Sequence, residues 1–215
     1  MLNFGRCAAV FDMDGTLIDS MPVWRVLNKE FLEKRSLPVP EHMRVDMDTY
    51  TTRYCAETFI REYNLPMTVD DFAAANEQIM RTRYASIPTK VGVPEYLSAL
   101  KKAGVRMIVA TNTEKDIAKN ALASKDILKY FEDILTPGMV GISKSNPEFW
   151  NVLAQHMMIS PDDMAVYEDT PAMMRSARCA GAKVVAVSEP VWRKQTDEIL
   201  SLCDIYVNDF RDLLA

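Results

Sequence analysis

The chain has 215 residues, a formal net charge of −5, 48% hydrophobic residues and 26% charged residues, as in an ordinary globular protein. Nucleic acids and anionic membranes bind clustered basic faces, so the acidic balance argues against both as partners. No apolar run approaches the roughly 20 residues of a membrane span, and no secretory leader is recognisable. We therefore expect a cytoplasmic protein, either a monomer or a weak dimer.

Short apolar runs typical of buried parallel strands alternate with amphipathic helices along most of the chain. The predicted strands are Ala8–Phe11, Met107–Ala110, Ile134–Leu135, Ala165–Tyr167, Val184–Val187 and Ile205–Val207. The clearest helices between them are Pro94–Ala103, Pro147–Met157 and Pro171–Ala180. This alternation predicts an α/β fold, with a Rossmann-like parallel sheet and helices on both of its faces.

One region interrupts the alternation. From about Met21 to Ser86 no convincing strand is found, and the segments 21–36, 51–64 and 68–86 show helical spacing of apolar residues. The pattern predicts an α-helical insertion between the first and second strands. We expect a catalytic core of residues 1–16 and 88–215 and an inserted helical domain of residues 17–87.

Several common catalytic patterns are absent from the sequence. The four cysteines are far apart and form no C-x-x-C pair, which argues against a disulfide framework or a cysteine-type zinc site. The two histidines are also far apart, and the glycine-rich dinucleotide and P-loop motifs are missing. The chemistry must therefore be carried by other residue types.

An acidic turn follows the first predicted strand. It reads V-F-D-M-D-G-T-L-I-D-S, and on extended chain the side chains of Asp12 and Asp14 point the same way. In open α/β sheets, ligands bind beyond the carboxyl ends of the strands, and Gly15 lets the backbone turn sharply there. Converging carboxylates at the end of a buried strand indicate a cation site.

The segment F-D-M-D-G-T-L-I-D-S resembles the first motif of the haloacid dehalogenase (HAD) superfamily in its phosphatase form. The helical insertion is similar to the cap of the phosphatase and β-phosphoglucomutase-like subfamily. The resemblance implies that Asp12 is the nucleophile that accepts the phosphoryl group. It implies that Asp14 is the general acid and base, and that its backbone carbonyl binds Mg²⁺. Dehalogenases proper lack the second aspartate, so Asp14 favours phosphoryl chemistry.

Two later segments are similar to the phosphate-binding motifs of that family. Thr111, with Asn112 beside it, follows the second predicted strand, and the resemblance implies that these residues bind phosphate. Lys144 lies in S-K-S-N-P, which resembles the third motif with Ser145 in place of a proline. The resemblance implies that Lys144 bridges Asp12 and the phosphate.

The acidic pair Glu168 and Asp169 ends another predicted strand and resembles the fourth motif, whose acidic residues complete the Mg²⁺ shell. Glu168 would bind the ion directly or through water. With Asp12 and Asp14, four carboxylates are then expected to converge. Two unit charges 4 Å apart interact by about 4 kcal/mol at an effective dielectric constant of 20, so such a group needs a cation. Mg²⁺ fits because it prefers hard oxygen ligands.

The function implied is Mg²⁺-dependent hydrolysis of a small phosphorylated metabolite through an aspartyl-phosphate. Two alternatives stay open: a phosphomutase of the β-phosphoglucomutase type, and a non-catalytic binding protein on the same fold. Those mutases carry a histidine shortly after the first motif, and Trp24 occupies that place here, which favours a phosphatase. The complete set of site residues disfavours the binding protein.

Overall fold

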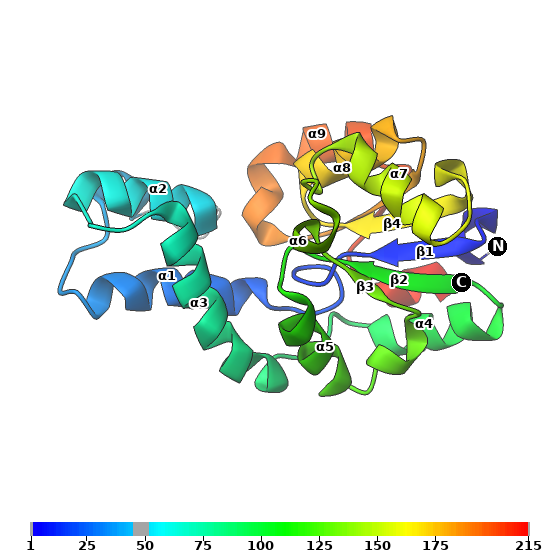
Figure 1. The fold of residues 1–215 in the computed structure, drawn as a ribbon, viewed down its shortest axis with the longest axis horizontal. Helices are drawn as coiled ribbons and strands as arrows, with labels where there is room; N and C mark the ends of the chain where they lie inside the picture. Colours follow the sequence, from blue (N-terminus) through cyan, green and yellow to red (C-terminus); the bar gives the residue numbers. More distant parts are fainter. Residues whose placement is uncertain (1, 45–51, 215) are drawn as a thin grey trace.

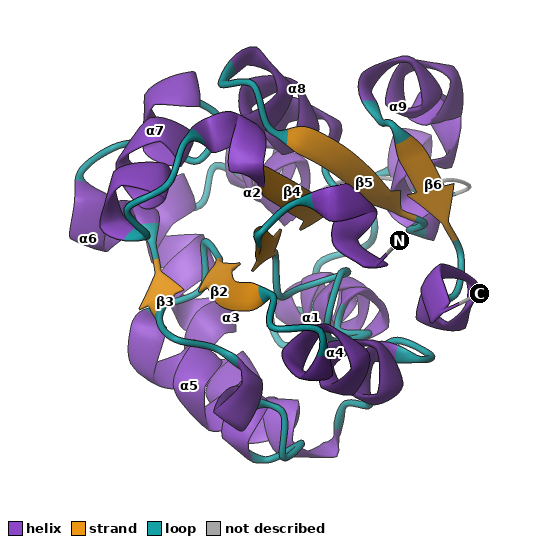
Figure 2. Ribbon diagram, turned by 90° about the vertical axis from the view of Figure 1, so that its right-hand side faces the viewer, coloured by secondary structure: helices purple, strands orange, loops and turns teal. Residues whose placement is uncertain are grey.

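The computed structural model describes residues 2–44 and 52–214. A six-stranded sheet with the order β3-β2-β1-β4-β5-β6 forms the centre, and all its strand pairs are parallel (Figures 1 and 2). The strands are β1 (Ala8–Phe11), β2 (Arg106–Ala110), β3 (Ile134–Leu135), β4 (Met164–Glu168), β5 (Lys183–Val187) and β6 (Ile205–Val207). The six predicted strands and the parallel α/β fold are thus confirmed.

Helices cover both faces of this sheet (Figure 2). The helices are α1 (Met21–Glu33), α2 (Thr52–Tyr63), α3 (Val69–Arg83), α4 (Val93–Lys102), α5 (Lys115–Ala123), α6 (Pro137–Val140), α7 (Pro147–His156), α8 (Pro171–Cys179) and α9 (Thr196–Leu202). Along β1, Ala9 and Phe11 pack in one apolar cluster with α4 and α5, and Ala8 and Val10 pack in a second with α7, α8 and α9. Because both faces are covered, every residue of β1 is buried.

The strand order reverses its direction between β1 and β4. The chain continues from β1 to β2 and β3 on one side, and β4, β5 and β6 extend the sheet on the other. In open α/β sheets such a switch point opens a crevice at the carboxyl ends of the two strands, and ligands bind there. The topology therefore puts the segment after β1 and the segment after β4 at the same place.

The helices α1, α2 and α3, here called the helical insertion, extend to one side of the sheet (Figure 1). They have an apolar cluster of their own, in which the rings of Phe31 and Phe72 lie 4.4 Å apart between centroids. The three predicted helical segments correspond to these helices, and Thr51, at the start of the second, lies outside the described residues. Among the described residues, no helix combines the length and apolar character needed to cross a bilayer.

Two connections join the helical insertion to the sheet, and they lie side by side. The backbone N–H of Asp19 donates to the carbonyl of Pro88 at 3.0 Å, and that of Lys90 donates to the carbonyl of Leu17 at 3.0 Å. The paired connections fix where α1 leaves the core and where the chain returns to α4. Residues at this junction can therefore contact both the sheet edge and the insertion.

Candidate active site

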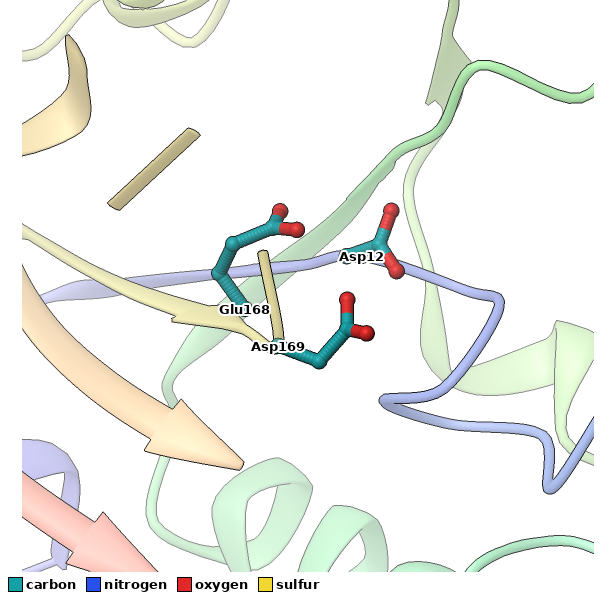
Figure 3. Close-up of side chains that lie close together, drawn as sticks. All are labelled: Asp12, Glu168 and Asp169. Atoms are coloured by element: carbon teal, nitrogen blue, oxygen red, sulfur yellow. The ribbon is translucent and has the colours of Figure 1, made fainter. Parts of the chain in front are cut away.

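Three buried carboxylates lie at the switch point of the sheet. Asp12 follows β1, Glu168 ends β4, and Asp169 comes next in the chain. The parallel register pairs Phe11 with Tyr167, so Asp12 and Glu168 are level with one another. Ligand oxygens of Asp12, Glu168 and Asp169 lie within 4.8 Å of one another (Figure 3). The structure thus brings together three of the four acidic residues that the sequence singled out.

Lys144 supplies the positive charge of this group. Its side chain is 1% exposed, and Nζ donates to Asp12 Oδ1 at 2.6 Å and to the carbonyl oxygen of Ala110 at 2.7 Å. Nζ also lies 2.8 Å from Glu168 Oε2, forming an ion pair. The expected contact with Asp12 is present, and Glu168 is a second partner that the sequence did not indicate. One buried ammonium therefore faces two carboxylates.

Three carboxylates share a single ammonium, and the pKa values of Asp12, Asp169 and Lys144 are all raised. Burial, followed by the charge of Glu168, raises the pKa of Asp12 to about 8 despite the opposing effect of Lys144. Burial and the charges of Glu168 and Asp12 also raise the pKa of Asp169. Although burial opposes it, the charges of Asp12 and Glu168 raise the pKa of Lys144, so that ammonium stays charged. All three carboxylates can therefore be ionised together at neutral pH only if a further positive charge joins the group.

This group fits a hard divalent cation. Its donors are carboxylate oxygens, which Mg²⁺ prefers, and all three residues are buried. Glu168 Oε2 is buried and accepts no well-directed hydrogen bond, despite its closeness to Lys144. A cation bound here would satisfy that oxygen and offset the excess negative charge.

Asp169 is held by its neighbours on both oxygens. Trp192 Nε1 donates to Oδ2 at 3.1 Å, and the hydroxyl of Thr170 donates to Oδ1 at 3.1 Å. The backbone of Gly15 passes close by with φ +83°, and a Cβ atom at this position would lie 2.7 Å from Asp169 Oδ2. Gly15 is therefore required both for the left-handed turn and for the approach of the two acidic segments.

The carboxylate of Asp14 does not belong to the group of three, so the expected convergence of four carboxylates is wrong for this side chain. Asp14 Oδ1 accepts hydrogen bonds from Ser20 Oγ at 2.6 Å and Tyr84 Oη at 2.7 Å. Its Oδ2 accepts from Thr113 Oγ1 at 2.8 Å, and Trp24 Nε1 lies 3.4 Å from Oδ1. These donors, none of which belongs to the group of three, hold the Asp14 carboxylate in place. The contact expected of its backbone carbonyl stays a prediction.

The two predicted phosphate-binding residues occupy different surroundings. Thr111 is buried one residue beyond β2, and its Oγ1 accepts the backbone N–H of Thr113 at 3.1 Å. Asn112 is exposed and lines a cavity. Thr113, which the sequence analysis did not select, contacts Asp14 directly. The segment after β2 therefore lies beside the site, and the phosphate contact itself stays a prediction.

A cavity of about 380 Å³ lies beside Asp14, between the segments that follow β1 and β2 and the helical insertion. Its walls come from the segments after β1 and β2 on one side and from α1, α2 and α3 on the other. The lining residues are Asp14, Met21, Trp24, Thr52, Arg53, Ala56, Val69, Asp70, Phe72, Ala73, Glu77, Asn112 and Thr113. Its volume lies near the lower end of the range of about 300–1,000 Å³ that is typical of small-molecule sites.

Some contacts of the site had no signal in the sequence. Tyr84 is 70 residues from Asp14, and Trp192 is 23 residues from Asp169. Neither residue stands in a motif, and each reaches the site only through the tertiary fold. Ser20 ends the first motif, but its spacing from Asp14 does not by itself indicate their hydrogen bond.

The fold and the acidic site together define a hydrolase of the Rossmann-like α/β class. The chain belongs to the haloacid dehalogenase-like hydrolases, whose family model matches residues 8–181. This confirms the family expected from the first motif.

Similar proteins include several curated phosphatases. The phosphorylated carbohydrates phosphatase of Thermotoga maritima is 23% identical, over 81% of this chain and 81% of that protein. The fructose-1-phosphate phosphatase YqaB of Escherichia coli is 28% identical, over 83% of this chain and 94% of that protein. A crystal structure of mutant CbbY from Rhodobacter sphaeroides with xylulose-1,5-bisphosphate matches with a TM-score of 0.76 at 20% identity, covering 98% of this chain and 95% of that one. That likeness shows the shared fold.

Proposed function

We propose that this protein is a Mg²⁺-dependent phosphomonoesterase that hydrolyses a small phosphorylated metabolite through an aspartyl-phosphate on Asp12. The observation that carries the proposal is the buried group of Asp12, Glu168 and Asp169 around Lys144 at the switch point of the sheet. Buried carboxylates in excess of their counter-charges are costly to keep for structure alone. They indicate a site that binds a cation and an anionic substrate together.

Asp12 would be the nucleophile. Lys144 donates to Oδ1, which fixes the carboxylate and leaves Oδ2 to attack phosphorus. A carboxylate nucleophile divides the hydrolysis into formation and breakdown of an acyl phosphate. Lys144 also offsets negative charge as the phosphoryl group approaches. Thr111 and Asn112, in the segment after β2, would donate hydrogen bonds to the phosphate oxygens.

Asp14 would transfer protons in both steps. Its carboxylate lines the cavity, where the leaving group of the ester would lie. In the first step it protonates the leaving oxygen, and in the second it takes a proton from the water that hydrolyses the acyl phosphate. Ser20, Tyr84 and Thr113 hold this carboxylate in place through hydrogen bonds of 2.6–2.8 Å.

Mg²⁺ would be held by Asp12, Asp169 and the backbone carbonyl of Asp14, with Glu168 binding directly or through water. The bound ion supplies charge stabilisation for the phosphoryl oxygens. Without it, burial and the charge of Glu168 keep the pKa of Asp12 high, and a protonated Asp12 is a poor nucleophile. The requirement for a cation therefore follows from this chain's own acids.

The helical insertion would act as a cap. We propose that residues 17–87 form this cap domain and that residues 1–16 and 88–215 form the core. The cavity between them would enclose the leaving group and exclude bulk water during the reaction. The paired connections through Leu17–Asp19 and Pro88–Lys90 would serve as its hinge.

The relatives support a phosphorylated sugar or a similar small metabolite as substrate. One acts on phosphorylated carbohydrates and another on fructose 1-phosphate, and a neighbour of the same fold binds a sugar bisphosphate. A cavity of about 380 Å³ suits a leaving group of this size. Trp24, at the place of the mutase histidine, lines the cavity and offers no second proton carrier.

The test is turnover of p-nitrophenyl phosphate with Mg²⁺ and with EDTA, for the wild type and for Asp12→Asn. We expect Mg²⁺-dependent release of phosphate by the wild type and a loss of at least about 10⁴-fold in Asp12→Asn, with no phosphoenzyme after acid quenching. Asp212→Asn, which neutralises an exposed aspartate near the C-terminus, serves as the control. Retained activity in Asp12→Asn would refute the nucleophile assignment. Isomerisation of a hexose 1-phosphate without phosphate release would favour a mutase.

A further inference from the structure

The cavity beside Asp14 has an excess of negative charge on its walls. Its lining contains the carboxylates of Asp14, Asp70 and Glu77 and, within the described part of the chain, one basic side chain, Arg53. The Arg53 side chain is 74% exposed and pairs with Glu57 at 3.0 Å. Its charge is paired with Glu57 and largely screened by solvent, and the other charged residues of the lining are carboxylates.

Basic side chains adjacent to the lining face other carboxylates. Arg25 follows Trp24 but pairs with the buried Glu189 at 2.8 Å. Arg81 lies one turn after Glu77 on α3 but pairs with Glu114 at 2.8 Å. These two charges are thus held outside the cavity by partners of their own.

The remaining lining is amphipathic and uncharged. Trp24, Met21 and Phe72 contribute apolar surface, while Thr52, Asn112 and Thr113 contribute hydroxyl and amide groups. An aromatic face beside hydrogen-bonding groups suits a sugar or polyol, which has apolar C–H faces and polar hydroxyls. A leaving group of that kind needs no counter-charge.

The negative charge of Glu77 is fixed in position. Its Oε1 accepts the backbone N–H of Glu114 at 2.8 Å, which ties α3 to the start of α5. Glu77 is half-buried, so solvent screens its charge less than that of a surface residue. Asp70 lies in the first turn of the same helix, where α3 begins. Both residues line the cavity; Asp70 is exposed at its surface, whereas Glu77 is half-buried.

We propose that the site selects monophosphate esters of uncharged sugars or polyols, and that Asp70 and Glu77 are specificity residues that reject a second anionic group on the leaving group. The inference rests on the proposed phosphatase function. The transferred phosphoryl group meets the ammonium of Lys144, whereas a second phosphate or carboxylate would meet the two insertion carboxylates. Selection by repulsion of the wrong ligand is a common means of specificity.

The experiment measures kcat/KM for matched pairs of substrates. One pair is glucose 6-phosphate and 6-phosphogluconate, and the other is fructose 1-phosphate and fructose 1,6-bisphosphate. We expect the wild type to favour the member without a second anionic group by about 30-fold, because a second anion would lie close to two like charges. The preference should fall as salt is raised from 20 mM to 500 mM.

The variants Glu77→Gln and Asp70→Asn test the residues directly. Glu77→Gln keeps a carbonyl oxygen for the Glu114 N–H, so the contact between α3 and α5 is retained. Each substitution should reduce the preference within a pair by about three- to tenfold, and the double variant by more. Glu33→Gln, an equal charge change on an exposed residue of α1 outside the lining, should leave the preference unchanged.

Two results would overturn the inference. One is a wild type that hydrolyses both members of each pair equally or favours the doubly anionic one. The other is a double variant with the wild-type preference. Turnover of p-nitrophenyl phosphate in the same preparations distinguishes a failure of the charge selection from a failure of the proposed phosphatase function. If it is hydrolysed while the preference is absent, the charge selection fails and the phosphatase function stands. If neither it nor any sugar phosphate is hydrolysed, the proposed function fails, and the inference fails with it.

Discussion

Two parts of the site are built in opposite ways: the carboxyl ends of the central strands, here called the sheet edge, and the part of the cavity lining that comes from the helical insertion, here called the cavity wall. At the sheet edge, the side chains of Asp12, Lys144, Glu168 and Asp169 are almost fully buried and in close mutual contact. On the cavity wall, α2 and α3 supply side chains such as Arg53 that are largely exposed. A parallel sheet fixes the first group through its register, whereas the second depends on three helices with a small core of their own. The proposed catalytic residues are thus held in fixed positions, whereas the proposed substrate selectivity depends on exposed residues, a kind of position at which substitutions are tolerated.

Asp14 lies between these two regions and is held by both. Thr113, from the sheet side, donates to one carboxylate oxygen, and Tyr84, from the end of the helical insertion, donates to the other. Burial and the charge of Asp14 raise the pKa of the Tyr84 hydroxyl, so it stays protonated and remains a donor. The orientation of the Asp14 carboxylate, the proposed acid, therefore depends on the position of the helical insertion.

The largest effect should come from Lys144→Met at the sheet edge. The substitution keeps a buried side chain of similar length but leaves Asp12, Glu168 and Asp169 without their ammonium. Loss of one partner from a buried ion pair costs about 3–5 kcal/mol, and loss of a charge that stabilises the transition state costs about 10²–10³-fold in kcat. Urea unfolding and steady-state kinetics would measure the two losses.

Lys102→Met, on the exposed end of α4, is the matched control and should change neither quantity by more than about 0.5 kcal/mol or twofold. A Lys144→Met variant with more than a tenth of the wild-type activity would contradict the account of the sheet edge.

The second effect concerns stability against pH without a metal. Burial and Glu168 raise the pKa of Asp12 to about 8, above the value of about 3.9 expected in the unfolded chain. For a raised carboxyl pKa, the stabilising contribution is fully present below about pH 4 and is lost as the pH rises to about 8. In EDTA, we expect Tm to fall by about 8–16 °C between pH 5 and pH 8, equivalent to about 4 kcal/mol.

Mg²⁺ should restore more of this stability at pH 8 than at pH 5, because it favours the ionised carboxylates. Asp12→Asn removes one of the two carboxyls with a raised pKa, so it should make the EDTA profile less steep and the metal-free protein more stable than the wild type at pH 8. Thermal unfolding of both proteins across this range would measure the difference. Identical pH profiles for the two proteins would show that Asp12 does not carry the repulsion.

Tyr84→Phe should have a smaller effect that depends on the substrate. Removing the hydroxyl leaves Asp14 with donors from Ser20 and Thr113, and on the insertion side with only the longer contact to Trp24 Nε1 at 3.4 Å. Alkyl phosphates need a proton on the leaving oxygen, whereas p-nitrophenolate leaves without one. We expect kcat to fall about 10–30-fold for a sugar phosphate and less than threefold for p-nitrophenyl phosphate. Equal losses on both substrates would indicate a structural role only.

The sheet edge could be predicted from the sequence, and the cavity wall could not. Strand ends are marked by apolar runs followed by polar residues, and this pattern indicates Asp12 and Asp169. Parallel pairing then brings such residues together by necessity. Lys144 lies between α6 and α7, and only its resemblance to the third motif of the family indicates it. Tyr84 stands in an ordinary amphipathic segment, and only the packing of the insertion against the core brings it to Asp14.

The side chain of Asp14 shows the limit of a local argument. Alternation along an extended chain predicts that Asp12 and Asp14 point the same way. The strand ends at Phe11, however, and the chain turns through Gly15, so that alternation no longer applies at Asp14. Donors from distant segments then decide where the carboxylate points. Sequence spacing identified the residue but not its partners.

The smallest effects should come from the ion pairs that join the helical insertion to the core, and they should differ with burial. Arg25 pairs with Glu189, whose side chain is 1% exposed, whereas Arg81 pairs with Glu114, whose side chain is 53% exposed. Exposed pairs contribute about 0–1 kcal/mol, while a buried carboxylate loses more when a partner is removed. Arg25→Gln should therefore raise KM about fivefold, and Arg81→Gln should raise it less than twofold. Because Lys90 still pairs with Glu189 at 2.7 Å, the protein should fold in both variants. A larger effect of Arg81→Gln would mean that the surface pair, and not the buried one, holds the insertion against the core.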